Sequence, residues 1–376
     1  MHQQLNFSTT FKHKKLDGFI VTNPVNIFYL TGFKGISPTE REAILIFSNQ
    51  GPTLITPTLI TARLYQNEAI KLKSKNLKVE IVDERNQILA LIQKLLKKAN
   101  RVGFEENDLK YSEHKDFKKA FSTRTVLVPI KNAIEDLRIL KTEEEIKKIE
   151  KAQIISQKAF EILVKTLKAG QTEVEIAEKL AKIIKSLGGQ GLAFESIIAS
   201  GKNSALPHYL TGKKKIKKGE VLLLDFGAKY QDYCADLSRT IFIGKANTRK
   251  QNIYNLVKKA QREAVDSIVG GHKSSDAYQK ANEVFKKEKL NKYFIHSLGH
   301  GIGLEVHEAP HLRPTPTTSQ LTRSTTDDRL MEGMVFSVEP GLYFPNWGGV
   351  RIEDLVTITN GKAKVLGKLQ KEIIVI

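Results

Sequence analysis

Four carboxylates stand at the ends of apolar segments whose pattern predicts buried strands. Asp225 follows four consecutive apolar residues, and Asp236 lies at a spacing typical of the neighbouring strand of a hairpin. Glu339 ends the apolar segment 334–338, and Glu353 begins another. Strands are poor in acidic residues, and a buried carboxylate must be paired or bind a metal ion. These four residues are therefore candidates for chemistry rather than for packing.

Few cations are close enough in sequence to neutralise these carboxylates. Arg239 and Arg351 are the nearby basic residues in the same predicted strands. Repulsion among four clustered carboxylates is best offset by divalent cations. We therefore expect a metal site rather than separate salt bridges.

Histidines in two segments add possible nitrogen ligands and hydrogen-bond donors. His300 is flanked by glycines, which let the backbone approach a neighbouring group closely, and His307 follows in the same segment. His208 ends the segment 203–208. A single histidine is by default a structural or surface residue, and we expect His296 to be a strand residue rather than a ligand.

The first third of the chain shows the pattern of an α/β domain. A helix is predicted over 87–98, where apolar residues recur three and four positions apart. A turn at 49–51 is expected to join a hairpin. Short apolar segments alternate with such helical patterns, which indicates an α/β layer. The predicted strands are 18–21, 43–47, 53–56, 79–82, 102–104 and 126–130.

The pattern of the remaining residues predicts a second domain. Capping-box spacing at Thr142/Glu145 and at Thr172/Glu175 predicts the starts of two helices. Asn360 and the glycine after it predict a hairpin turn. We place the domains at 1–135 and 136–376. Two later helices, 248–269 and 274–288, interrupt strands predicted at 196–199, 221–226, 240–243, 335–338 and 355–358.

Composition narrows the class of protein. The chain has 376 residues, of which 40% are hydrophobic, so it can bury a sizeable core and is not a disordered or coiled-coil protein. No apolar segment approaches the roughly 20 residues of a membrane-spanning helix, and the first 15 residues lack a signal-peptide core. The single cysteine, Cys234, fits a reducing cytosol. We therefore expect a cytoplasmic globular protein without a membrane partner.

Positive charge is in excess: 60 Lys and Arg against 41 Asp and Glu give a net charge of +19. Such a charge is compatible with a nucleic-acid partner. However, no basic segment is interleaved with aromatic residues in the way that single-strand binders require. Lysines spread over a solvated surface are the favoured interpretation, and a nucleic-acid partner is not expected.

Five motifs in the second domain resemble those of the aminopeptidase P, prolidase and methionine aminopeptidase superfamily. They are LDFGA at 224–228, YCAD at 233–236, GHGIGLEVHE at 299–308, VEPG at 338–341 and GVRIED at 349–354. The N-terminal third also resembles the smaller domain of the Xaa-Pro peptidase branch, through LDG at 16–18, TNP at 22–24 and YLTGF at 29–33. The resemblance implies an α/β (α+β) chain. A creatinase/prolidase-like α/β domain would precede a catalytic domain of the pita-bread fold.

The resemblance also implies a pair of divalent metal ions. Asp225 would bind the first ion, His300 and Glu339 the second, and Asp236 and Glu353 would bridge both. Four oxygen ligands and one imidazole suit Mn(II), and Co(II), Zn(II) or Fe(II) could occupy the same set. Such ions make water nucleophilic at neutral pH and polarise a carbonyl.

Further roles follow from the same resemblance. Glu339 would move a proton from the nucleophile to the leaving nitrogen. His208 and His307 would hold the substrate and the developing oxyanion. Arg351 would contact the substrate side of the site or orient the metal-binding carboxylates. For Tyr233, hydrogen bonding near the metals and core packing remain equal alternatives.

The implied activity is hydrolysis of the N-terminal Xaa-Pro bond of peptides by a homodimeric exopeptidase. Proline matters because its tertiary amide has no N–H for an enzyme to recognise. Dipeptides and longer peptides both remain possible substrates. The polar segment 313–329 is longer than expected of the family, and His311, Arg313 or Arg323 could bind the carboxylate of a dipeptide. A harmless surface insertion is the alternative.

Two other functions stay open at this level. Some relatives of the fold have lost catalysis and bind nucleic acids or proteins, and others hydrolyse creatine-like amidines without metal. Both kinds lack several metal ligands, whereas this chain keeps all five positions. An active metallopeptidase is therefore the preferred interpretation.

Overall fold

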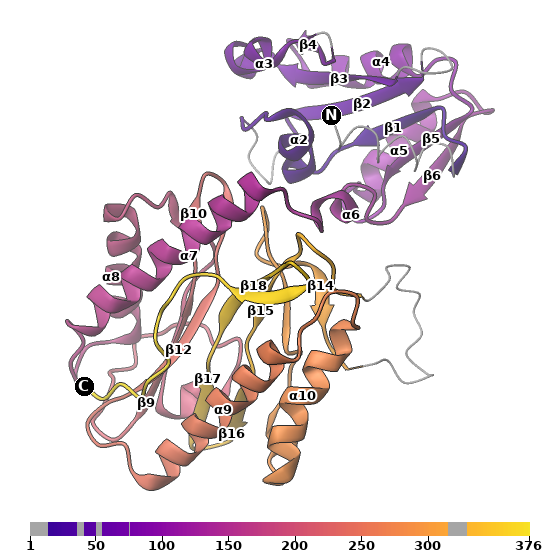
Figure 1. Ribbon diagram of the computed structural model, residues 1–376. Coiled ribbons are helices and arrows are strands. Elements are labelled where there is room, and N and C mark those ends of the chain that lie inside the picture. The colour runs from indigo at the N-terminus through magenta and orange to yellow at the C-terminus, as the bar shows by residue number, and fades with distance from the viewer. Residues whose placement is uncertain (1–13, 36–40, 50–54, 75, 315–328) are drawn as a thin grey trace. The chain divides into compact units, whose positions relative to one another are not determined.

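The computed structural model describes residues 14–35, 41–49, 55–74, 76–314 and 329–376. The chain divides into two compact units, Met1–Arg138 and Ile139–Ile376 (Figure 1). The N-terminal segment expected to lack a signal core lies almost wholly outside the described residues. The same is true of most of the expected turn at 49–51 and of the polar segment 313–329 with Arg323.

A six-stranded mixed sheet forms the centre of the first unit, in the order β4-β3-β2-β1-β5-β6. β1, β2 and β3 pair antiparallel, whereas β4, β5 and β6 join parallel to their neighbours. The strands are β1 (Gly18–Val21), β2 (Ala43–Asn49), β3 (Ile55–Ala62), β4 (Lys78–Val82), β5 (Arg101–Glu105) and β6 (Val126–Ile130).

Helices cover both faces of this sheet because alternate strand residues point to opposite sides. Phe19 of β1 belongs to one buried cluster together with Ile27. The next residue, Ile20, belongs to a second cluster together with Ile92. The unit is therefore a three-layer α/β/α domain, which agrees with the predicted α/β class. Its helices are α2 (Pro24–Thr31), α3 (Gln66–Leu72), α4 (Arg85–Leu95), α5 (Tyr111–Ala120) and α6 (Glu135–Arg138), with a 3₁₀ turn η1 (Arg63–Tyr65).

The breaker pair Asn23-Pro24 ends β1 and also begins α2. The Asn23 side chain accepts hydrogen bonds from the backbone N–H groups of Val25 (2.8 Å) and Asn26 (3.1 Å). Proline fits the first helical position because its missing N–H would have no partner there. Nothing in the apolar spacing predicts α2, so the cap is the signal that a helix starts here.

In the second unit, α7 (Glu143–Val164) and α8 (Glu173–Ser186) pack on the sheet β12-β9-β8. Phe160 of α7 and Leu180 of α8 share a buried cluster with Leu222 and Leu224. Both predicted capping boxes are present. The strands are β7 (Gly191–Leu192), β8 (Ile197–Ser200), β9 (Val221–Phe226), β10 (Ala228–Tyr230), β11 (Tyr233–Cys234) and β12 (Leu237–Phe242), with a 3₁₀ turn η2 (Gly201–Ala205) after β8.

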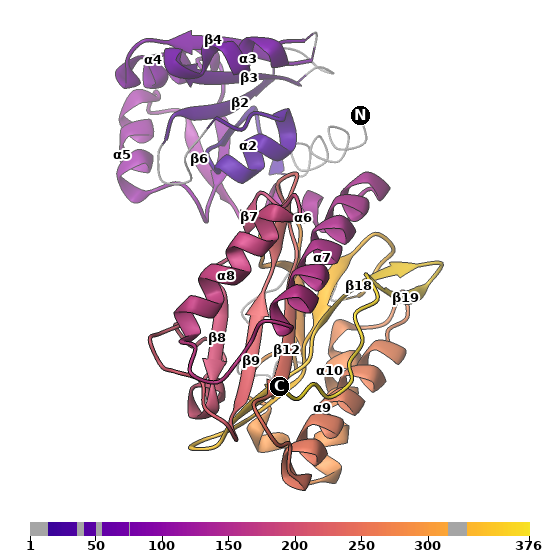
Figure 2. The same ribbon diagram turned by 90° about the vertical axis from the view of Figure 1, so that its left-hand side faces the viewer.

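A second helix pair, α9 (Thr248–Asp266) and α10 (Ser274–Lys287), packs on the sheet β14-β13-β15-β18-β19. Figure 2 shows the two helix pairs on opposite sides of the strands of this unit. The strands therefore form the interior in which the candidate residues lie. They are β13 (Gly299–Gly301), β14 (Glu308–Leu312), β15 (Val335–Val338), β18 (Asp354–Thr359) and β19 (Lys362–Val365), with the hairpin β16 (Gly341–Phe344)–β17 (Gly348–Arg351) and a 3₁₀ turn η3 (Asn291–Tyr293).

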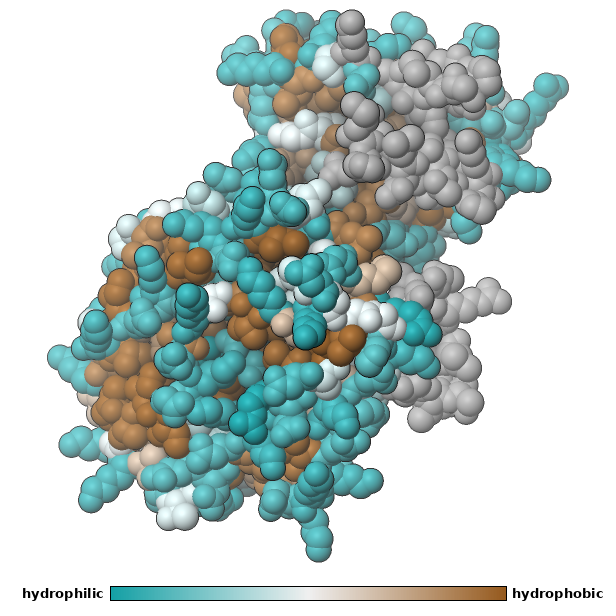
Figure 3. All heavy atoms as spheres, in the orientation of Figure 1, coloured by the Kyte–Doolittle hydropathy of each residue, from teal (hydrophilic) through white to brown (hydrophobic). Residues whose placement is uncertain are grey.

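Polar side chains cover much of the molecular face in Figure 3, with apolar patches between them. Among the described helices, none combines the length and apolar character needed to cross a membrane.

Candidate metal centre

Each of the five predicted ligands lies in or directly beside a strand of the second unit. Asp225 is in β9, and Asp236 immediately precedes β12, which pairs antiparallel with β9. His300 is the middle residue of β13. Glu339 follows β15, and Glu353 lies between β17 and β18. Residues more than a hundred positions apart therefore meet only through the packing of the two sheets.

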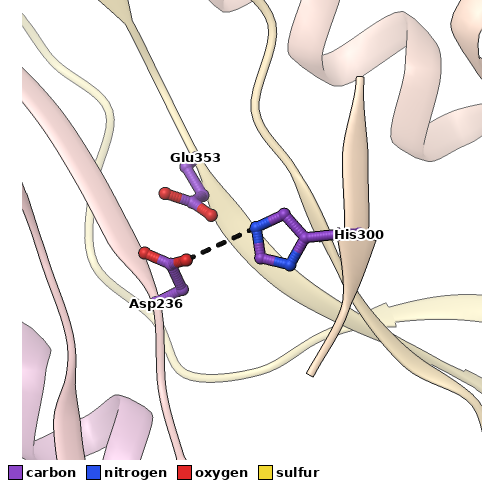
Figure 4. A group of neighbouring side chains, drawn as sticks. All are labelled: Asp236, His300 and Glu353. Atoms are coloured by element: carbon purple, nitrogen blue, oxygen red, sulfur yellow. Dashed lines mark ion pairs between the residues drawn. The ribbon is translucent and has the colours of Figure 1, made fainter. Parts of the chain in front are cut away.

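Three of these side chains converge on one point. Asp236, His300 and Glu353 each offer a ligand atom, and these atoms lie within 4.8 Å of one another. Figure 4 shows the three side chains pointing toward a common centre from separate backbone segments. His300 Nε2 lies 3.6 Å from Asp236 Oδ2 and 3.5 Å from Glu339 Oε1. Glu339 therefore borders the same centre.

Arg351 connects Asp225 to this group. Its guanidinium donates a hydrogen bond to the carboxylate of Asp225, and its Nε lies 3.8 Å from Glu339 Oε2. The same Nε donates to Ser238 Oγ (2.8 Å), and Nη1 donates to the hydroxyl of Tyr343 (2.8 Å). The arginine is thus held on several sides, with its charge directed at two of the carboxylates.

Burial dominates the electrostatics of the centre. Desolvation and the neighbouring carboxylates raise the pKa values of Asp236 and Glu353 well above their ordinary range. Desolvation also raises the pKa of Glu339 to about 7, although Arg351 acts in the opposite direction. Without a further cation, these groups would hold protons near neutral pH.

One oxygen of each of three carboxylates is buried without a hydrogen-bond donor in the described part of the chain. These atoms are Asp225 Oδ1, Asp236 Oδ1 and Glu353 Oε1. An unpartnered buried polar atom is costly, and a cluster of them suits a bound cation. The donor set of carboxylate oxygens with one imidazole fits divalent ions that prefer oxygen ligands.

The local backbone prepares His300 as a ligand. Its Nδ1 lies 3.1 Å from the carbonyl of Gly301 and donates to it, so Nε2 keeps its lone pair and faces Asp236 and Glu339. Burial lowers the pKa of His300, which favours the neutral imidazole that binds metals. The flanking glycines are required by close packing. A Cβ at Gly299 would lie 1.9 Å from the carbonyl oxygen of Ser337, and one at Gly301 would lie 2.0 Å from that of Ala309.

His307 and His208 lie at the exposed side of the centre. The His307 ring lies 4.4 Å from the His300 ring, measured between centroids. Pro207, the neighbour of His208, has its carbonyl 3.5 Å from Arg351 Nη1. Both histidines are exposed, in contrast to His300.

The structure also identifies residues that the sequence pattern does not predict for the site. Tyr343 and His296 extend the contacts of Arg351, since His296 Nε2 lies 2.8 Å from the Tyr343 hydroxyl. Burial lowers the pKa of His296 to about 3, so it stays neutral and accepts this hydrogen bond. The one available signal is a polar aromatic residue inside an apolar strand, which must find a partner. The hydroxyl of Tyr233 donates to Glu145 of α7 (2.9 Å).

A second buried network of hydrogen bonds fixes the backbone around Glu353. Arg239 donates to the Glu353 carbonyl and pairs with Asp354 (2.7 Å). Asp354 also accepts hydrogen bonds from Gln261 (3.1 Å) and from Lys371. The carbonyl of Ser238 accepts from the Glu353 N–H (3.1 Å), which fixes Glu353 to the strand that follows Asp236. Backbone and side-chain contacts together determine where the Glu353 carboxylate lies.

The contact of Gly301 predicts a specific stability effect. We expect Gly301→Ala to lower the free energy of unfolding by about 1–3 kcal/mol, because the added methyl overlaps the Ala309 carbonyl and must displace β13. Thermal denaturation of wild type and variant checks this. Gly270→Ala is the matched control, since its Cβ would make only an ordinary contact of 3.4 Å. Equal melting temperatures for the Gly301 and Gly270 variants would contradict the tight packing around His300.

The raised pKa of Glu339 predicts a pH dependence of stability when cations are removed with a chelator. Because the folded pKa of about 7 exceeds the unfolded value, its stabilising contribution is complete below about pH 4 and is lost as pH rises through about 7. The loss of stability attributable to Glu339 is about 3 kcal/mol. Melting temperatures between about pH 5 and pH 8 should therefore fall more steeply for wild type than for Glu339→Gln. Parallel curves would show that Glu339 does not titrate in this way.

Comparison with family models and with known proteins shows what this chain resembles. The model of Metallopeptidase family M24 matches residues 147–360, and that of the Creatinase/Prolidase N-terminal domain matches residues 5–140. An Xaa-Pro dipeptidase of Pyrococcus furiosus is 37% identical over 361 residues, which cover 96% of this chain and 95% of the relative.

Solved structures extend the similarity to the fold. The Xaa-Pro dipeptidase from Bacillus anthracis has a TM-score of 0.89 at 32% identity and covers 100% of this chain and 99% of its own. The X-Pro aminopeptidase from Thermotoga maritima has a TM-score of 0.83 at 32% identity, covering 96% and 98%. The expected fold is confirmed: a creatinase/prolidase-type domain precedes a pita-bread domain. The chain belongs to metallopeptidase family M24.

Proposed function

We propose that this protein is an exopeptidase that hydrolyses the N-terminal Xaa-Pro bond of peptides with the help of two divalent cations. The observation that carries this proposal is the convergence of Asp236, His300 and Glu353 beside Glu339 and Asp225, with three buried oxygens lacking donors. Asp225 would hold one ion, His300 and Glu339 the other, and Asp236 and Glu353 both. When bound, the ions supply a nucleophilic water and polarise the scissile carbonyl.

Glu339 is proposed as the proton carrier. Its carboxylate takes a proton from the attacking water and delivers it to the leaving nitrogen of the proline. A carboxyl group that is largely buried, with a pKa raised to about 7, is suited to exchange protons near neutral pH. Ser337 Oγ donates to Glu339 Oε1 (3.3 Å), and Arg351 lies on the other oxygen, so the group is held in one orientation.

His208, His307 and Arg351 are proposed to act on the substrate side. His307 lies against His300 and would donate to the oxyanion that develops on the scissile carbonyl. His208, which lies in the segment after β8, would also bind the substrate. Arg351 would orient the carboxylates around the bound peptide, and its hydrogen bond to Asp225 supports this role.

For the substrate, we propose Xaa-Pro dipeptides, with longer Xaa-Pro peptides as the alternative. The relative at 37% identity is an Xaa-Pro dipeptidase, whereas one structural neighbour is an X-Pro aminopeptidase. His311 lies opposite His300 in the β13–β14 register, a position from which it could bind the carboxylate of a dipeptide.

Several finer features belong to the same proposal. Mn(II) is the proposed ion because four of the five ligands are carboxylates. We propose a cytoplasmic homodimer, with domains at 1–135 and 136–376. A single buried cysteine, Cys234, is compatible with a reducing compartment.

The proposal predicts metal-dependent hydrolysis that Glu339→Gln abolishes. The amide cannot exchange protons, so we expect kcat to fall by at least about 100-fold. Turnover of an Xaa-Pro dipeptide, an Xaa-Pro-Xaa tripeptide and an Xaa-Ala dipeptide is measured with and without Mn(II). The Xaa-Ala peptide controls for general peptidase activity, and the tripeptide separates the two substrate classes.

Failure has two recognisable forms. If chelated and Mn(II)-supplemented protein both leave every peptide intact, the chain is not an Xaa-Pro peptidase, and a binding function takes its place. A Glu339→Gln variant with near-normal kcat would remove Glu339 as the proton carrier while leaving the activity in place.

A further inference from the structure

A glutamate outside the metal centre is wholly buried at the start of α8. Glu173 has no exposed side-chain surface and, within the described chain, takes part in no ion pair. A buried carboxylate without a cation is expensive unless hydrogen bonds replace its water. The partners that compensate for this burial therefore indicate what the residue does.

In the part of the chain that the structure describes, every hydrogen-bond donor to the Glu173 carboxylate comes from one short segment, residues 200–209. Glu173 Oε1 accepts from the N–H of Ser200 (2.8 Å), from its hydroxyl (2.7 Å) and from Asn203 Nδ2 (3.1 Å). Glu173 Oε2 accepts from the hydroxyl of Tyr209 (2.9 Å). Asn203 Nδ2 also donates to Tyr209 (2.8 Å), so the two ends of the segment are joined through one carboxylate.

Capping of α8 does not explain this arrangement. The helix has its own capping box, in which Thr172 Oγ1 accepts from the Glu175 N–H (3.2 Å) and Glu175 Oε2 accepts from the Thr172 N–H (2.7 Å). The Glu173 carboxylate is directed instead to the segment that follows β8.

The same segment also contacts β17 and Arg351, which borders the candidate metal centre. Ser204 Oγ accepts from the Gly349 N–H in β17 (2.8 Å), and a Cβ at Gly349 would lie 2.1 Å from the Ser204 carbonyl. The carbonyl of Pro207 lies 3.5 Å from Arg351 Nη1. His208 follows directly and is exposed. The segment is therefore held between α8 and β17, and His208 lies within it.

We propose that Glu173 is a positioning residue for the reaction, because its carboxylate closes the loop 200–209 and so places His208 against the substrate. The inference rests on the proposed function, since it takes from it the contact of His208 with the substrate. It assigns a role to a buried charge that neither binds the proposed ions nor caps its helix.

A double-mutant cycle on kcat/KM tests this role. Glu173→Gln replaces a carboxylate oxygen by an N–H group that cannot accept from Tyr209 or Asn203. We expect about a tenfold loss of kcat/KM for the Xaa-Pro dipeptide in the wild-type background. In the His208→Ala background the same substitution should lower kcat/KM by less than about twofold, because the imidazole that Glu173 positions is absent. An equal loss in both backgrounds would overturn the proposal in favour of a general structural role.

The matched control is Glu175→Gln, the same substitution in the same turn of α8. It alters the capping box but not the loop, so we expect kcat/KM to stay within about twofold of wild type. A loss equal to that of Glu173→Gln would show that the helix end, not the loop, is responsible. If Glu173→Gln fails to fold, Tyr209→Phe removes the two hydrogen bonds that the hydroxyl makes with Glu173 and Asn203, and it enters the same cycle.

Hydrogen exchange gives a readout that does not depend on activity. We expect peptides covering 200–209 to lose protection in Glu173→Gln, while peptides from β15 and β18 remain unchanged. Unchanged protection of 200–209 would overturn the clamp. Lack of turnover by wild type would defeat the proposed function instead, and the exchange measurement would still decide whether Glu173 holds the loop.

Discussion

Gathering several carboxylates at one buried point is the constraint on which the second unit depends. Removing each ion from water costs several kcal/mol, and like charges add repulsion. Arg351 offsets part of this charge, through Asp225 and Glu339, but Asp236 and Glu353 meet His300 instead. The fold must therefore hold these groups in place by contacts elsewhere, and a bound cation pair would relieve the remaining strain.

Those contacts form layers around the centre. Ser238, Tyr343 and His296 surround Arg351, and Arg239 with Asp354 supports the backbone of Glu353. Each layer restricts the conformations that the groups nearer the centre can adopt. Preorganised polar groups of this kind stabilise charge that develops during a reaction without having to reorient. The Glu173 clamp extends the same design to the loop that carries His208.

The sequence allowed the regular elements to be predicted where periodicity was strong. The strands 221–226 and 335–338 match β9 and β15, and the helix predicted over 248–269 is α9 (Thr248–Asp266). Asn360 and Gly361 form the predicted turn between β18 and β19, with positive φ angles of 53° and 72°. Short or polar elements such as α2, α5 and β13 left no such signal, because few residues define them and tertiary packing decides their structure.

The candidate site shows a similar division. Acidic residues at the ends of apolar strands pointed to four of the five proposed ligands, because a carboxylate in a strand requires a reason, and the family resemblance added His300. The hydrogen bonds between Arg351 and Asp225 and between Tyr343 and His296 depend on how separate strands pack together. The sequence pattern therefore did not predict them. Glu173 illustrates the limit: in sequence it is one of several glutamates at a helix start, and only the loop packed on it reveals its role.

The number of ions held by the centre is the most direct measurement of its nature. We would incubate the purified protein with Mn(II), remove free ions by gel filtration and determine the metal content by mass spectrometry. The proposed centre predicts about two ions per chain in wild type and at most about one in Asp236→Asn, which loses a shared ligand. Wild type without stoichiometric metal, or an Asp236→Asn variant with the same content as wild type, would contradict a metal centre built on these carboxylates.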